Sequence, residues 1–210
     1  MSSNIKNLVE LLDSTTLEVS SKTALVFGSK SIIYQQLNDS SRQLASALFE
    51  LGVRRGDKVG LWLPNCPEFV YSFFAILRLG ATVVPINTML KREEARYVVE
   101  DSLSKILICS VDKSSDSENI LSRINTLKHL IFLPKPKSNK IAFDFNDLIN
   151  THKKFKEKIE IKEDDLAEVV YTSGTTGKPK GACLSHKNLI SNIKDCTQVI
   201  KCSKKDSTIC

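Results

Sequence analysis

The chain has 210 residues, of which 41% are hydrophobic and 26% charged, the composition of an ordinary globular protein with one large domain or two small ones. The formal net charge of +6 comes without interleaved basic and aromatic residues, so we expect no nucleic-acid partner. The six cysteines show no C-x-x-C spacing and no histidine at ligand spacing, which predicts reduced thiols and no metal site.

No stretch of the sequence resembles a targeting signal or a membrane-spanning segment. Residues 1–19 place acidic side chains inside their apolar run and have no cleavage-like tail, unlike a secretory signal. The most apolar segment, residues 69–77, has only nine residues before Arg78 and is too short to span a bilayer. We therefore expect a cytoplasmic location, with peripheral attachment to a membrane as the alternative.

Helical and strand-like patterns alternate along the chain. Apolar residues recur at three- and four-residue steps in the segments expected to be helices, which are residues 5–12, 34–51, 67–80, 92–102, 119–127 and the run that begins at His186. Short apolar runs expected to be strands are residues 23–27, 31–33, 58–63, 81–84, 105–109, 129–133, 167–170 and 181–184. Such alternation is typical of helices packed on a parallel sheet. We predict an α/β fold with a mostly parallel sheet flanked by helices.

Three polar groups have both a functional and a plain structural interpretation. Residues 152–158 (HKKFKEK) are basic enough for an anionic partner or a membrane surface, but with Glu157 interleaved we expect a solvated helix face. Residues 163–165 (EDD) are interpreted as a solvated turn instead of a metal site. His186 follows Ser185, the expected helix N-cap, and is interpreted as a packing or capping residue instead of a catalytic one.

The most informative stretch is residues 171–181, which read YTSGTTGKPKG. It holds three of the chain's eight glycines, four Ser or Thr hydroxyls and two lysines. Glycines let backbone N–H groups turn inward toward a ligand, hydroxyls add donors, and lysines add positive charge. Because predicted strands flank the stretch, we interpret it as a loop that is held between structured segments and binds the phosphates of a nucleotide.

The spacing excludes two common phosphate-binding motifs. A Walker loop has a glycine five positions before its Gly-Lys pair and Ser or Thr directly after it. Here Thr172 and Pro179 occupy those two places. A Rossmann G-x-G-x-x-G fingerprint does not occur in the sequence.

The stretch does resemble the phosphate-binding signature of the adenylate-forming enzymes, which include acyl-CoA synthetases, luciferases and the adenylation domains of peptide synthetases. Residues 56–65 (GDKVGLWLPN) and 80–87 (GATVVPIN) are similar to two motifs that precede this signature in the same superfamily, in the same order. The amino-acid sequence of residues 64–87 is most similar to that of fatty acyl-CoA synthetases. The resemblance extends over essentially the whole chain.

The resemblance implies a phosphate-binding role for nine residues and no catalytic residue in this chain. The nine are Thr172, Ser173, Gly174, Thr175, Thr176, Gly177, Lys178, Lys180 and Gly181. Loop N–H groups and hydroxyls would contact the β- and γ-phosphates, and Lys178 or Lys180 would offset their charge. Such a loop transfers no proton, so it supplies neither a general base nor a nucleophile.

The resemblance also implies an activity and its co-substrates. A carboxylic acid, with a fatty acid as the first expectation, attacks the α-phosphorus of ATP, whose phosphates carry Mg²⁺, and forms an acyl-adenylate and pyrophosphate. A thiol, that of coenzyme A, then displaces AMP to form a thioester. Family members are more than twice as long as this chain, so the resemblance implies an N-terminal part that is inactive alone.

Two units are expected within this part, an N-terminal α/β subdomain over residues 1–165 and the start of a second subdomain over residues 166–210. Two other functions stay open. The chain is alternatively a non-catalytic nucleotide-binding module, acting as a dimer or with a partner chain that supplies a C-terminal half. A third alternative is an adenylating enzyme for an aryl acid or a carrier-protein acceptor.

Overall fold

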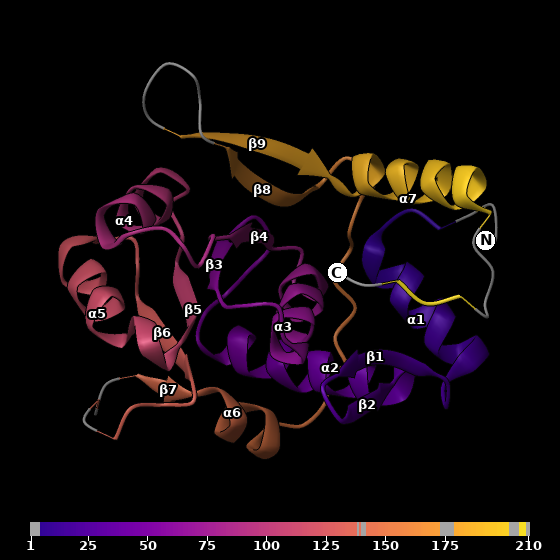
Figure 1. The fold of residues 1–210 in the computed structure, drawn as a ribbon, viewed down its shortest axis with the longest axis horizontal. Coiled ribbons are helices and arrows are strands. Elements are labelled where there is room, and N and C mark those ends of the chain that lie inside the picture. Colours follow the sequence, from indigo (N-terminus) through magenta and orange to yellow (C-terminus); the bar gives the residue numbers. More distant parts are fainter. Residues whose placement is uncertain (1–4, 138, 140–141, 173–178, 202–205, 209–210) are drawn as a thin grey trace.

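A seven-stranded sheet forms the centre of the computed structural model, which describes residues 5–137, 139, 142–172, 179–201 and 206–208 (Figure 1). Its strands are β3 (Lys58–Trp62), β4 (Thr82–Pro85), β5 (Ile106–Ser110), β6 (His129–Leu133), β7 (Phe143–Asp144), β8 (Leu166–Thr172) and β9 (Lys180–Ser185). They lie in the order β7-β6-β5-β3-β4-β8-β9, and every neighbouring pair is parallel except β8 and β9. The predicted α/β fold is confirmed.

Successive residues of the central strands are buried on opposite faces of this sheet. In β5, Ile106 and Ile108 belong to one apolar cluster, whereas Leu107 and Cys109 belong to another. All four side chains are fully buried. A parallel strand that is covered on both faces needs apolar residues at consecutive positions, which is why this segment reads as an unbroken apolar run in the sequence.

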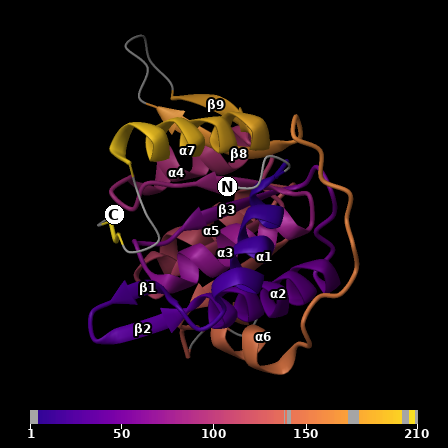
Figure 2. The ribbon, with the colours of Figure 1, turned by 90° about the vertical axis from the view of Figure 1, so that its right-hand side faces the viewer.

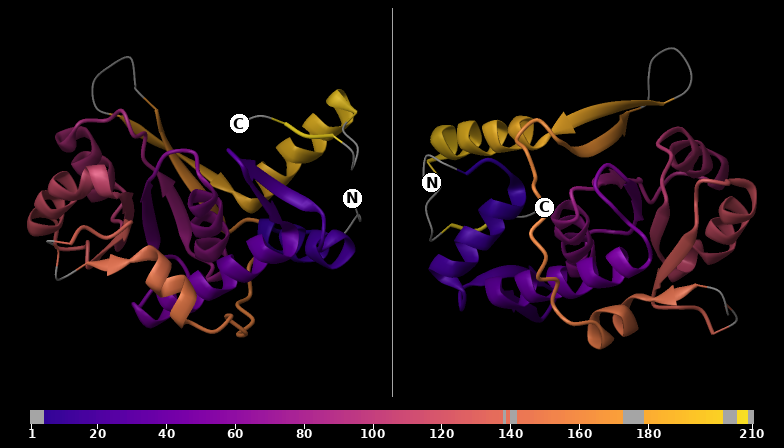
Figure 3. Two further views of the ribbon diagram at one scale, coloured as in Figure 1. Left: turned by 60° about the horizontal axis from the view of Figure 1, so that its bottom comes forward. Right: turned by 180° about the vertical axis from the view of Figure 1, so that it is seen from behind.

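Helices cover both faces of the sheet (Figures 1 and 2). The first apolar cluster, which contains Ile106 and Ile108, includes residues of α1 (Leu8–Val19), α2 (Tyr34–Glu50), α3 (Pro67–Arg78), α6 (Phe145–Thr151) and α7 (His186–Ile200). The second cluster, which contains Leu107 and Cys109, includes residues of α4 (Arg92–Asp101) and α5 (Ser114–Arg123). A 3₁₀ turn, Val111–Lys113, precedes α5. The antiparallel hairpin of β1 (Thr23–Phe27) and β2 (Lys30–Ile33) packs beside α1 and α2 (Figure 3). Among the described residues, no helix combines the length and the apolar character that a membrane span requires.

Helix ends follow local signals where the sequence contains them. Pro67 is the first residue of α3, and Gly52 follows α2 with a φ of +90°, as predicted. The prediction for α1 began too early, because the side-chain oxygen of Asn7 accepts from the N–H of Glu10 at 2.9 Å and so sets the start at Leu8. It also ended too early, at residue 12, whereas the helix continues to Val19. Similarly, α5 begins at Ser114 and not at residue 119, since its first turn is polar and carries no apolar period.

The basic stretch 152–158 is not a helix, so that prediction was wrong. It belongs to the connecting segment (residues 152–165), which runs without helix or strand from α6 to β8 (Figure 2). Phe155 is buried, its ring centroid lies 5.4 Å from that of Phe49, and its N–H donates to the carbonyl of Arg42 at 3.0 Å. One buried aromatic ring and a bond to α2 fix an extended path. The turn predicted at residues 163–165 is confirmed at residues 163 and 164.

A cluster of charged side chains joins three helices beside this segment. Arg78 of α3 donates to both carboxylate oxygens of Asp13 on α1, at 2.7 and 3.1 Å, and to the Ser41 hydroxyl on α2 at 3.1 Å. Arg42 of α2 donates to the same Asp13 carboxylate at 3.0 Å and to the carbonyl of Phe155 at 3.3 Å. Burial by itself would raise the pKa of Asp13, but the hydrogen bond and charge of Arg78 outweigh it and lower that pKa.

Removing the Asp13 carboxylate is expected to destabilise the fold, because the Arg78 side chain is only 5% exposed and loses its counter-charge. We expect D13A to lower the free energy of unfolding by about 2 to 4 kcal/mol, measured by urea denaturation. The control is E93A, whose exposed carboxylate pairs with arginines at the surface, where solvent screens the pairs, so that its removal is expected to change the free energy of unfolding much less. Equal losses in the two variants would contradict a structural role for the Asp13 cluster.

Candidate functional site: the β8–β9 hairpin

The predicted phosphate loop connects two strands, as expected from the sequence, and the structure pairs these strands with each other. β8 and β9 are antiparallel, with Tyr171 opposite Gly181 and Thr172 opposite Lys180 in the last register pair. We call this last pair, Thr172 and Lys180, the hairpin mouth. Both of its residues are exposed. The ladder therefore places a hydroxyl and an ammonium group on opposite sides of the loop entrance.

Six of the nine predicted phosphate ligands lie outside the residues that the structure describes. These are Ser173, Gly174, Thr175, Thr176, Gly177 and Lys178. The three that are described, Thr172, Lys180 and Gly181, are brought together at the base of the loop. Phosphate binding by all nine stays a prediction.

Gly181 has a packing reason to be glycine. A Cβ atom at this position would lie 2.7 Å from Cγ1 of Val169 and 3.1 Å from Cζ of Tyr171, closer than carbon atoms approach without displacement. Both neighbours belong to β8, which faces Gly181 across the ladder. The absence of a side chain at Gly181 thus leaves room for the Tyr171 ring, a constraint that the motif alone did not reveal.

One residue near the hairpin was missed by sequence reasoning. The Tyr171 hydroxyl donates to Oδ2 of Asp101 at 2.6 Å, and Asp101 is the last residue of α4. Burial, together with this hydrogen bond and the negative charge of Asp101, raises the pKa of Tyr171, so its hydroxyl stays protonated and can donate at neutral pH. No local pattern marks Asp101, because its partner lies 70 residues further along the chain.

The hairpin is joined to the rest of the sheet mainly at its other end. β4 and β8 share one aligned pair, Val83 and Glu168, and the Thr82 hydroxyl donates to the carbonyl of Leu166 at 3.1 Å. These contacts lie in the first half of β8, away from the hairpin mouth. The division into subdomains at residue 165 stays a prediction.

His186 has a structural role at the end of β9. Ser185 caps α7, as predicted, and the buried His186 ring accepts the N–H of Leu8 through Nδ1 at 3.3 Å. Burial lowers the pKa of His186 to about 4, although Asp165 and Glu10 act in the opposite direction. A neutral ring that joins α7 to α1 agrees with the packing role expected from the sequence.

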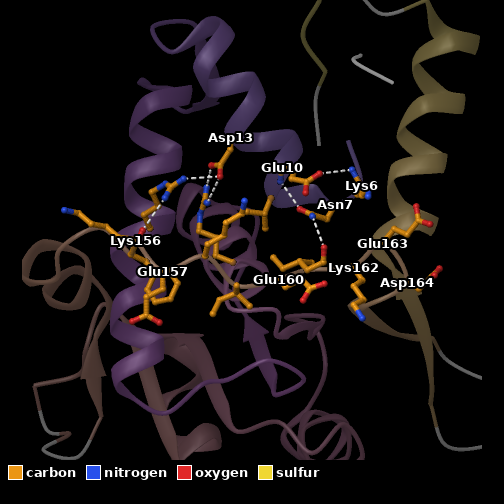
Figure 4. Close-up of a pocket in the computed structure, with 17 residues that line it drawn as sticks. Lys6, Asn7, Glu10, Asp13, Lys156, Glu157, Glu160, Lys162, Glu163 and Asp164 are labelled. Carbon is orange, nitrogen blue, oxygen red and sulfur yellow. Dashed lines mark hydrogen bonds and ion pairs between the residues drawn. The ribbon is translucent and has the colours of Figure 1, made fainter. Parts of the chain in front are cut away.

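A cavity of about 750 Å³ lies away from the hairpin. It is bounded by α1 and the connecting segment, and its lining includes Asp13, which Figure 4 labels, with Arg42 and Arg78. Its wall includes Asn7, whose side-chain amide donates to the carbonyl of Ile161 at 3.2 Å. Charges of both signs line it, and Asp13 pairs there with Arg42 and Arg78. Among the described residues, no group of three His, Cys, Asp or Glu side chains has the proximity to hold a metal ion.

The sequence between β8 and β9 is rich in groups that can donate hydrogen bonds to phosphate, and β9 is an edge strand of a mostly parallel sheet with helices on both faces. This combination defines a class of nucleotide-binding α/β protein. A sequence profile of the AMP-binding enzyme family matches residues 13–210, nearly the whole chain. The chain therefore belongs to the AMP-binding enzyme family.

Individual relatives are acid–CoA ligases. The chain is 32% identical over 182 residues to a crotonobetaine/carnitine–CoA ligase of Escherichia coli, and the match covers 80% of this chain but 34% of that protein. Among solved structures, an anthranilate CoA ligase in complex with anthranoyl-AMP is 33% identical with a TM-score of 0.81, covering 86% of this chain and 35% of that one. A long-chain-fatty-acid-CoA ligase from Archaeoglobus fulgidus is 26% identical with a TM-score of 0.86, covering 96% and 41%. The chain spans about a third of the length of these relatives.

The neutral state of His186 predicts an acid-sensitive fold. Below pH 6.5 the unfolded chain takes up a proton at this histidine, whereas the folded chain does so only near pH 4. The contribution of His186 to the free energy of unfolding is therefore expected to be constant above pH 6.5 and to fall between pH 6.5 and 4, by up to about 1.4 kcal/mol per pH unit. Urea titrations across this range measure the slope.

The variant H186N, which keeps a side-chain acceptor for Leu8 but cannot titrate, is expected to lose most of this decline. An undiminished slope in H186N would show that other groups cause the acid sensitivity.

Proposed function

We propose that this chain is the ATP-phosphate-binding N-terminal part of an ATP-dependent acid–CoA ligase. The observation that supports it most directly is the β8–β9 hairpin, whose mouth presents Thr172 and Lys180 beside a loop with the phosphate-binding signature of adenylate-forming enzymes. Membership of the AMP-binding enzyme family supports the same activity. In this proposal all nine predicted residues, from Thr172 to Gly181 without Pro179, bind phosphate.

The proposed reaction has two steps, and the hairpin acts in the first. A carboxylate oxygen attacks the α-phosphorus of ATP, the bond to the β-phosphate oxygen breaks, and pyrophosphate leaves. Loop N–H groups, hydroxyls and Lys180 hold the leaving phosphates and offset their charge, which is how enzymes promote such a substitution without proton transfer. Mg²⁺ enters bound to ATP. The thiol of coenzyme A then attacks the acyl carbon and releases AMP.

A fatty acid is the substrate class that we propose first. Two observations support it, the amino-acid sequence of residues 64–87 and the structural similarity to a long-chain-fatty-acid-CoA ligase. An aryl acid is the second candidate, because the anthranilate CoA ligase is 33% identical to this chain. We propose a cytoplasmic site of action, with peripheral membrane attachment as the alternative. A dimer, or a partner that completes the fold, stays an alternative to a longer single chain.

Binding of a phosphate chain by the hairpin is tested with inorganic tripolyphosphate and the 210-residue chain, by isothermal titration calorimetry. K180A is expected to bind three- to tenfold more weakly, a loss of about 0.7 to 1.4 kcal/mol, because one charge-assisted contact is removed. The control is K187A, which removes an equally exposed lysine that pairs with Glu163 and Asp164 at the start of α7. Equal affinities of K180A and K187A would argue against the hairpin as the site.

Turnover is tested by acid-dependent exchange of labelled pyrophosphate into ATP, with a panel of fatty and aryl acids. We expect no exchange by the 210-residue chain, because it matches only 34% of the length of the crotonobetaine/carnitine–CoA ligase. Exchange above background, lost in K180A, would contradict the proposed inactivity of this part alone. The acid that supported it would then identify the substrate class.

A further inference from the structure

We propose that Asp101 is a positioning residue for the phosphate loop, acting through the hydroxyl of Tyr171 to set the place of the hairpin mouth. The inference rests on the proposed function of the hairpin. It assigns to the end of α4, a helix outside the signature, a part in binding the phosphate chain.

The first observation concerns how the hairpin is supported. The last half of β8, which carries Tyr171 and Thr172, extends beyond its single aligned pair with β4 at Glu168. Its register partner is β9, the other strand of the same hairpin. Within the described residues, the Tyr171–Asp101 hydrogen bond is the side-chain hydrogen bond that joins this half of β8 to the body of the fold. This bond therefore ties the part of β8 next to the mouth to α4.

The second observation is the strength and the anchoring of that bond. A hydroxyl-to-carboxylate distance of 2.6 Å falls in the range of charge-assisted hydrogen bonds. Asp101 ends a helix whose Ala95, Val98 and Val99 are fully buried in the second cluster, against which Tyr171 also packs. The acceptor is thus held by a packed helix.

The third observation is that both sides of the Tyr171 ring are constrained. Its hydroxyl is held by Asp101, and its Cζ atom lies over the bare Cα of Gly181, where a Cβ would approach to 3.1 Å. Thr172 follows directly and pairs with Lys180. A residue advances a strand by about 3.3 Å, so the fixed ring lies one step from the mouth.

The fourth observation concerns the place of Asp101 in its own helix. A carboxylate in the last turn interacts unfavourably with the partial negative charge of the helix C-terminus, and α4 has no basic residue there. The neighbouring Glu100 at least pairs with Arg96, at 2.7 Å. The Tyr97 hydroxyl also contacts Asp101, but at 3.4 Å. The short contact of Asp101 is the one to Tyr171.

The loss of the Asp101 carboxylate has opposite expected effects on anion affinity, depending on whether it acts by its charge or by positioning the mouth. This difference permits a decisive test. Removing a negative charge near an anion site should tighten the binding of an anion. If Asp101 instead positions the mouth, D101A should weaken binding although it removes a repulsive charge. D101N retains a carbonyl oxygen that can accept from Tyr171, so it should bind as well as the unmodified chain or better.

The experiment measures tripolyphosphate affinity of the 210-residue chain by calorimetry. We expect D101A and Y171F each to bind three- to tenfold more weakly, the double variant no more weakly than the worse single one, and D101N within twofold of the unmodified chain or tighter. E100A is the matched control, an adjacent exposed carboxylate on the same helix, and should bind within twofold. Amide hydrogen exchange at Thr172 and Lys180 should become faster in D101A and Y171F only, with melting temperatures unchanged.

Unmodified affinity in D101A, alongside weakened binding in K180A, would overturn the inference and leave the proposed function intact. Equal weakening in D101N and D101A would also overturn it, because the loss would not follow the hydrogen bond. No tripolyphosphate binding by the unmodified chain would overturn both the proposed function and the inference.

Discussion

Burial of the central strands on both faces is the constraint from which the rest of the architecture follows. β3 and β5 have no exposed face, so apolar helices must cover the sheet from two sides. The connections between parallel strands supply them, with α3 on the face of α1 and α2, and α4 and α5 on the other. On the face that carries five helices, the buried guanidinium of Arg78 is paired with the partly exposed carboxylate of Asp13.

The candidate site lies at the edge of this packed body, where the chain can approach a ligand. The β8–β9 hairpin leaves the sheet after a short parallel contact, and its mouth is exposed while its base is held. Three hydrogen bonds join the hairpin and its following helix to the rest of the fold. Thr82 of β4 bonds to the start of β8, Asp101 of α4 bonds to Tyr171 near the mouth, and His186, directly after β9, bonds to Leu8. Exposed residues that a packed scaffold positions are a common arrangement for binding sites.

The sequence predicted the sheet, the helices and the loop because each depends on short-range patterns. Apolar runs identified the strands, and Pro67 and Gly52 identified helix ends. The same reasoning failed at residues 152–158, where a majority of charged residues concealed the buried Phe155 ring and the extended path that it fixes. It also placed both ends of α1 too early. The first turn of this helix depends on the side chain of Asn7, and its last residue is Val19.

What the sequence alone determined is the order of elements, the phosphate-binding signature and the family to which the chain belongs, since these depend on residue types at fixed spacing. What the tertiary structure decided are the contacts between distant residues: Asp13 with Arg78, Leu8 with His186, and Asp101 with Tyr171. Such pairs leave no periodic trace, because folding brings their partners together through packing of whole elements. The space that requires glycine at position 181 was decided in the same way.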